Sequence, residues 1–169
     1  MQPPIMVFSW NASDDNRLGT DKTTLHAYGE TYARVFKDIG DHGLPGAVME
    51  IGVLSGASIV NLRHAFPERT VYGLDIDLSA LVHRLTDDAN TQYLEMDATD
   101  IREYSRVPAE ETFALIIDDG SHRAEDIVAA FVLWGHRVVP GGYYVIEDIT
   151  EDILPTLQTL LVPLGAKHG

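Results

Sequence analysis

The chain has 169 residues, of which 45% are hydrophobic and 22% charged, with no cysteine and a formal net charge of −14. This balance predicts one domain with a packed core, over residues 1–169, and argues against disorder. The acidic charge argues against nucleic acid and anionic membrane surfaces as partners, and the lack of cysteine excludes disulfides and zinc–thiolate sites. The N-terminus has no basic region and no stretch approaches about 20 apolar residues, so we expect a cytoplasmic protein without a signal peptide.

The N-terminal part of the chain leads up to a first predicted helix. Residues 1–18 carry weak signals, and we predict a surface arm there. The segment from Gly19 to Tyr28 combines a lysine, an acid, hydroxyls and an imidazole, and it could reach over a sheet edge to touch a ligand. The following stretch, 28–39, has apolar residues at a 3,4,3 spacing typical of one helix face. We interpret this stripe as packing against a sheet; its members are Tyr32, Val35, Phe36 and Ile39.

A strand and a glycine turn are predicted next. Residues 47–51 have a strand pattern, Gly52 and Gly56 allow a sharp turn close to a ligand, and a helix continues to Phe66. The Gly-x-x-x-Gly spacing differs from the Gly-x-Gly-x-x-Gly pattern of dinucleotide binders. Glu50, just before the turn, would repel a pyrophosphate but suits a cationic or amino-bearing ligand.

Two further predicted strands, 70–77 and 92–97, end in acids. Asp75 lies about 20 residues after the glycine turn, where an acid typically hydrogen-bonds the ribose hydroxyls of a nucleoside ligand. Asp77 is interpreted as the cap of a helix over residues 78–88. Asp97 ends the second of these strands.

The most informative stretch is the apolar run 113–117, followed by Asp118-Asp-Gly-Ser-His122. A continuous apolar run indicates a strand buried on both faces of a parallel sheet, and ligands bind at the carboxyl edge of such sheets. Another predicted strand, 142–148, ends in Glu147 and Asp148. The alternative is that these polar residues merely cap the following helices, which we prefer for Ser121 alone.

The repeated strand–helix order predicts an α/β fold. Right-handed crossovers would give a Rossmann-like parallel sheet of order 3-2-1-4-5 with helices on both faces. A helix over 123–139 would bury Trp134, and a last helix is indicated over 150–164. We find no sixth or seventh strand, so the last helix or a partner subunit must cover the edge beyond the fifth strand.

This topology brings two acidic strand ends together. Adjacent strands lie about 4.8 Å apart, so Asp119, Glu147 and Asp148 can converge on one ion. Their oxygens suit a hard cation such as Mg²⁺. His122, one short turn past Asp119, would face whatever the metal holds.

The motifs resemble those of class I S-adenosylmethionine methyltransferases. The matching residues are Glu50-x-Gly52 with Gly56, Asp75, Asp97, and Pro140-Gly-Gly before the fifth strand. Over residues 17 to about 150 the pattern is similar to the metal-dependent sugar O-methyltransferases of macrolide biosynthesis, the mycinamicin and demethylmacrocin type. That likeness rests on Gly19-Thr-Asp-Lys22, Leu25-His26, Ile116-Ile-Asp-Asp-Gly-Ser-His122 and Ile146-Glu-Asp148. The chain departs from the usual fold in lacking a pattern for its last two strands.

The resemblance implies a role for each matching residue. Mg²⁺ would be held by Asp119, Glu147 and Asp148, with His122 as the general base. The cofactor S-adenosylmethionine would be bound by Glu50, Gly52, Asp75 and Asp97, to which we add Ser58 and Asp118. The implied acceptor is a hydroxyl of a sugar or other small molecule, within a glycosylated natural product of antibiotic biosynthesis.

Two other classes of function stay open. The scaffold could catalyse other small-molecule chemistry, as a cyclase or isomerase, which the missing strands favour. It could also be a non-catalytic binding or dimerisation module, which would bind neither S-adenosylmethionine nor Mg²⁺. The glycine spacing and Glu50 disfavour an NAD-dependent enzyme. The open sheet edge and the leucine-rich last helix predict a homodimer.

Overall fold

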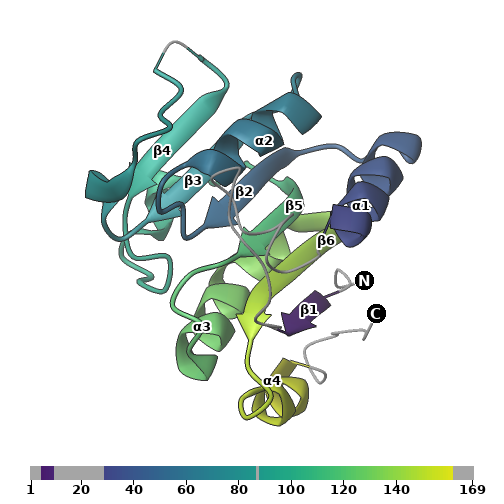
Figure 1. The fold of residues 1–169 in the computed structure, drawn as a ribbon, viewed down its shortest axis with the longest axis vertical. Coiled ribbons are helices and arrows are strands. Elements are labelled where there is room, and N and C mark those ends of the chain that lie inside the picture. Colours follow the sequence, from purple (N-terminus) through teal and green to yellow (C-terminus); the bar gives the residue numbers. More distant parts are fainter. Residues whose placement is uncertain (1–4, 10–28, 87, 162–169) are drawn as a thin grey trace.

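The computed structural model describes residues 5–9, 29–86 and 88–161 (Figure 1). Its centre is one sheet of parallel strands in the order β1-β6-β5-β2-β3-β4. The order predicted for the five strands is confirmed, as β4-β3-β2-β5-β6. The strands are β1 (Ile5–Ser9), β2 (Ala47–Ile51), β3 (Val71–Asp75), β4 (Thr91–Glu95), β5 (Phe113–Asp118) and β6 (Val138–Ile149).

Strand β1 corrects the prediction for the N-terminus and for the sheet edge. It lies within the stretch expected to be a surface arm, and it pairs in parallel with β6, with Ile5 opposite Tyr144 and Val7 opposite Ile146. The edge of β6 is therefore covered by this strand, which Figure 1 shows at the far side of the sheet from β4. The physical reason is that the backbone of the short apolar run 5–8 can hydrogen-bond the open edge of strand β6. The rest of the predicted arm lies outside the described residues.

Helices cover both faces of the sheet, as predicted. They are α1 (Gly29–Asp41), α2 (Ala57–Ala65), α3 (Ala124–Trp134) and α4 (Leu154–Leu161). Helices α1 and α2 pack on one face through residues such as Val35 and Ile59, against strand residues such as Val48 and Leu115. Helices α3 and α4 pack on the other face, where Trp134 is fully buried. Because side chains alternate along a strand, each central strand supplies apolar residues to both layers.

The helix predicted over residues 78–88 does not form as predicted. Among the described residues of this stretch, 78–86 and 88, only the 3₁₀ turn Leu78–Ala80 is helical, and Asp77 caps it, as expected, by accepting a hydrogen bond from the Ser79 amide at 2.8 Å. The chain then runs along the β2–α2 loop, where the amides of Val82 and His83 donate to the Ser55 carbonyl at 3.1 and 2.9 Å. These contacts between distant segments replace the local helical bonds.

None of the helices within the described ranges is both long and apolar enough to cross a membrane.

Candidate active site

A cleft of about 500 Å³ lies at the carboxyl edge of the sheet. Its walls come from the residues that follow β2, β3, β4 and β5, from the start of α3 and from the end of β6. Six aspartates line it, and none of the described lining residues is a lysine or arginine. The six are Asp75, Asp97, Asp118, Asp119, Asp126 and Asp148. The cleft therefore suits a ligand with positive charge or with many hydroxyl groups.

The turn after β2 needs glycine at position 52. Gly52 has a φ of +87°, and a Cβ atom there would lie 2.1 Å from the Asp119 carbonyl oxygen. The Asp119 amide also donates to the Ile51 carbonyl at 2.8 Å. The ends of β2 and β5 are thus in direct contact, which only a residue without a side chain permits.

Asp75 organises this turn from the end of β3. One of its carboxylate oxygens, Oδ2, accepts hydrogen bonds from the amides of Val53 and Leu54 at 2.8 and 2.9 Å. The other oxygen accepts from the Asp77 amide at 3.1 Å. Asp75 also lines the cleft. The structure therefore gives it a structural role at the turn, and its predicted contact with ribose hydroxyls stays a prediction.

Asp97 lies two residues past the end of β4 and also lines the cleft. Its carboxylate accepts hydrogen bonds from the amide and the hydroxyl of Thr99, at 2.8 and 2.7 Å. The next residue, Ala98, accepts a hydrogen bond through its carbonyl from the buried indole nitrogen of Trp134 at 2.7 Å. Trp134 is a core residue, as predicted, and it also holds one wall of the cleft.

Glu50 and Ser58 lie together beneath the turn. Glu50 is completely buried, and the Ser58 hydroxyl donates a hydrogen bond to its carboxylate. Neither residue is among the described residues that line the cleft. Their assignment to cofactor binding stays a prediction.

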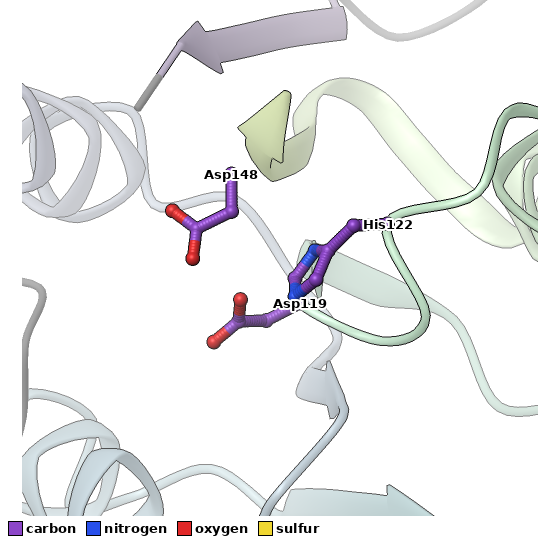
Figure 2. A group of neighbouring side chains, drawn as sticks. All are labelled: Asp119, His122 and Asp148. Carbon is purple, nitrogen blue, oxygen red and sulfur yellow. The ribbon is translucent and has the colours of Figure 1, made fainter. Parts of the chain in front are cut away.

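Three of the side chains that line the cleft converge on one another (Figure 2). Asp119 and His122 come from the loop after β5, Asp148 comes from the end of β6, and their ligand atoms lie within 4.8 Å of one another. His122 and Asp148 have φ values of +57° and +53°, which L-residues with side chains rarely adopt. Such backbone strain is typical of functional sites. We refer to Asp119, His122 and Asp148 as the acid–histidine cluster.

Each of the two aspartates in the cluster directly follows a buried acid, and a tyrosine hydroxyl donates a hydrogen bond to each of these buried acids. Asp118, before Asp119, accepts a hydrogen bond from the Tyr144 hydroxyl at 3.1 Å, and burial raises the pKa of Asp118 to about 7. Glu147, before Asp148, is buried and accepts a hydrogen bond from the Tyr32 hydroxyl.

These positions bear on the predicted roles of the two buried acids. Asp118 lines the cleft, as its assignment to cofactor binding requires, whereas Glu147 is not among the described lining residues. The metal role of Glu147 stays a prediction.

The sequence interpretation missed both tyrosines. Tyr32 was assigned to simple packing of α1, and no role was assigned to Tyr144. The available signal was chemical: a tyrosine in an apolar stripe or a buried strand carries a hydroxyl that needs a hydrogen-bond partner. Which acid would supply that partner could not be read from the sequence.

The donor set of the acid–histidine cluster fits a divalent cation. Two carboxylates and an imidazole offer oxygen and nitrogen atoms within the span that one ion can bridge. Carboxylate oxygens are the preferred ligands of Mg²⁺ and Mn²⁺. The cluster can therefore hold such an ion at the cleft wall.

Comparison with known proteins gives the family. The model of a methyltransferase domain matches residues 49–149. The chain is 32% identical over 154 residues to an 8-demethyl-8-α-L-rhamnosyl tetracenomycin-C 2′-O-methyltransferase of Streptomyces olivaceus, covering 84% of this chain and 38% of that protein. It is also 32% identical to the mycinamicin VI 2″-O-methyltransferase of Micromonospora griseorubida, covering 78% of this chain and 33% of that protein.

The fold agrees with this relationship. A structure of the mycinamicin-pathway methyltransferase MycE in complex with Mg and SAH has a TM-score of 0.70 and 28% identity, over 88% of this chain and 44% of that one. The chain thus spans less than half the length of these relatives. The match to the methyltransferase domain runs from within strand β2 to the end of β6 and includes all three members of the acid–histidine cluster. The chain belongs to the methyltransferase domain family.

Proposed function

We propose that this chain binds S-adenosylmethionine and Mg²⁺ and transfers a methyl group to a hydroxyl of a small molecule, a sugar on a glycosylated natural product. The observation that carries the proposal is the convergence of Asp119, His122 and Asp148 on one wall of the aspartate-lined cleft. A family match alone would support only the fold, because one fold hosts many functions.

The cofactor half of the site is assigned to the ends of β2, β3 and β4. The backbone at Gly52 comes close to the cleft, and Asp75 and Asp97 present carboxylates at its wall. Such acids can accept hydrogen bonds from ribose hydroxyls and from an amino group. The sulfonium of S-adenosylmethionine is a cation, so a cleft lined by six aspartates also favours it electrostatically.

The catalytic half is assigned to the ends of β5 and β6. Asp119 and Asp148 would hold Mg²⁺, and Glu147 is retained as the third predicted ligand. When bound, the ion would lower the pKa of an acceptor hydroxyl and orient it. His122 would remove the hydroxyl proton, because an imidazole ordinarily exchanges protons near neutral pH.

The acceptor class is inferred from the relatives. Their names describe methylation of rhamnosyl tetracenomycin and of mycinamicin VI, which are glycosylated natural products. The absence of lysine and arginine among the described lining residues supports a neutral, hydroxyl-rich acceptor rather than an anionic one.

Two measurements test the proposal. Calorimetry should show binding of S-adenosylmethionine and of Mg²⁺, and both should persist in Asp152→Asn, which changes an exposed acid outside the cleft. Transfer of a labelled methyl group should then be screened with mycinamicin VI and rhamnosyl tetracenomycin as first acceptors. Binding of neither ligand would overturn the proposal and favour a non-catalytic module.

Self-association is part of the proposal. The predicted homodimer rested partly on an open edge of β6, and β1 now occupies that edge. The other premise remains, since α4 exposes Leu160 beside its buried Leu157 and Leu161. Light scattering at micromolar concentration should give the mass of a dimer, and a monomer mass would end this part of the proposal.

A further inference from the structure

The acid pairs at the ends of β5 and β6 are built alike. In each pair the second acid belongs to the acid–histidine cluster, and the first acid is buried and accepts a hydrogen bond from a buried tyrosine. Tyr144 reaches Asp118 from the neighbouring strand, on the α3 side of the sheet. Tyr32 reaches Glu147 from helix α1, on the opposite side. The sequence pattern places Tyr32 in the packing face of α1, and its hydrogen bond to an acid of the site was not expected from that pattern.

Tyr32 lies close to the acids of the site. It is 8% exposed, and its ring packs against Phe36 with a centroid separation of 5.5 Å. Burial raises the pKa of Tyr32 well above its ordinary value, and neighbouring carboxylates, led by Glu147, raise it further. The other carboxylates are Glu50 and Asp119. Its hydroxyl donates a hydrogen bond to the Glu147 carboxylate.

A buried carboxylate beside a metal site is held in one orientation by a hydrogen-bond donor such as a tyrosine hydroxyl. Glu147 is 1% exposed, so bulk water has little access to its carboxylate. One of its carboxylate oxygens accepts a hydrogen bond from the Tyr32 hydroxyl. Carboxylates at metal sites are commonly oriented by hydrogen bonds from residues that do not touch the ion. Glu147 also precedes Asp148, whose backbone is in the left-handed region. A change in the orientation of the Glu147 side chain would therefore also shift the neighbouring Asp148 in the acid–histidine cluster.

We propose that Tyr32 is a positioning residue of the metal site: its hydroxyl orients the Glu147 carboxylate and thereby sets the affinity of the site for a divalent cation. This inference rests on the proposed function, because it assumes that Asp119, Asp148 and Glu147 serve one ion. Helix α1 then contributes to the site as well as covering the sheet. The expected consequence is that removing one oxygen atom from Tyr32 weakens metal binding.

The chain offers a matched control for this test. Tyr143 on β6 donates a hydrogen bond to Asp38 on α1, so it also joins these two elements through a phenol and a carboxylate. Neither Tyr143 nor Asp38 lines the cleft or belongs to the acid–histidine cluster, within the part of the chain described. Tyr143→Phe therefore removes a comparable link without touching the proposed metal site.

The experiment compares cation binding by the unaltered chain, Tyr32→Phe and Tyr143→Phe. Mg²⁺ is titrated by calorimetry, and Mn²⁺ by electron paramagnetic resonance, with no acceptor present. Tyr32→Phe should raise the dissociation constant roughly 10–100-fold, the usual effect of losing a residue that orients a metal ligand. Tyr143→Phe should leave it unchanged, while melting curves verify that both variants are folded.

A second measurement needs no mutation and keeps both tyrosine hydroxyls. When tyrosines are replaced by 3-fluorotyrosine, the fluorine resonance assigned to Tyr32 should shift on saturation with Mg²⁺, and that of Tyr143 should not. Unchanged metal affinity in Tyr32→Phe, equal weakening in both variants, or a Tyr32 resonance insensitive to Mg²⁺ would overturn the inference. Failure of the unaltered chain to bind either ion would instead overturn the proposed function, on which the inference depends.

Discussion

His122 is placed either to remove a proton from an acceptor or to complete the coordination of an ion, since it lies beside both Asp119 and Asp148. We expect the first role. His122→Ala should keep its affinity for Mg²⁺ and S-adenosylmethionine, while the methyl-transfer rate falls by roughly 10²–10⁴, the usual contribution of a general base. The loss should shrink at high pH, where hydroxide can replace the imidazole. Rates and calorimetry on the same preparation separate the roles, because a variant that no longer bound Mg²⁺ would make His122 a ligand.

Asp75 stabilises the turn after β2 and is also predicted to bind the ribose hydroxyls of the cofactor. Asp75→Ala should weaken S-adenosylmethionine binding by about 1–3 kcal/mol, the range for hydrogen bonds to a charged group. It should also lower the melting temperature, because the amides of Val53 and Leu54 lose their acceptor. Asp75→Asn is the matched variant, since its amide oxygen can still serve the turn. Calorimetry giving unchanged affinity for Asp75→Ala would exclude a role in cofactor binding.

At the scale of elements, Arg63 joins helix α2 to the chain around it. Its guanidinium pairs with Asp88, just before β4, through two nitrogens. It also donates to the carbonyls of Phe66, Pro67 and Arg69 in the turn that leads to β3. A lysine could not make these bonds together, because they require the planar fork of arginine. Arg63 therefore anchors two loops to one helix.

The Arg63–Asp88 pair predicts a pH dependence of stability. The hydrogen bond from Arg63, and then that from the Asn90 amide, lower the pKa of Asp88 from 3.8 to about 2. Because the folded-state pKa is depressed, this stabilisation is present above about pH 4 and is lost as the pH falls towards 2. Chemical denaturation should show a lower unfolding free energy for Asp88→Asn at pH 7 and a weaker decline between pH 4 and pH 2.

An exposed acid in the same region is the control for this prediction. Glu68→Gln changes a solvent-facing residue in the turn after α2 and should leave the decline intact. The same acid dependence in Asp88→Asn as in the unaltered chain would mean that the Arg63–Asp88 pair does not account for it.

At the scale of the whole molecule, the net charge of −14 should make the fold sensitive to salt. Like charges repel across a compact chain, and raising the ionic strength from about 0.01 M to about 0.1 M shortens the screening length from about 30 Å to about 10 Å. We expect NaCl to raise the melting temperature over this range. MgCl₂ at matched ionic strength should raise it further, because an ion bound only by the folded state adds stability. Equal effects of the two salts in scanning fluorimetry would contradict a specific Mg²⁺ site.

The sequence by itself determined the central sheet and the edge where the site lies. The apolar run 113–117 indicated a buried strand next to Asp118, and the repeated strand–helix order favoured the arrangement β4-β3-β2-β5-β6. Gly52 was predictable because the turn requires its conformation. The convergence of Asp119 and Asp148 followed from strand adjacency alone.

The tertiary structure alone decided the features that depend on distant partners. Strand β1 forms because the edge of β6 was open, and the segment after Ala80 is not helical because its amides reach Ser55. The hydrogen bond between Tyr32 and Glu147 joins residues 115 positions apart, so no local pattern could predict it. Periodicity and spacing report the secondary structure and the end of each strand. Which buried hydroxyl meets which buried acid is set by how the layers pack, and only the folded chain brings them together.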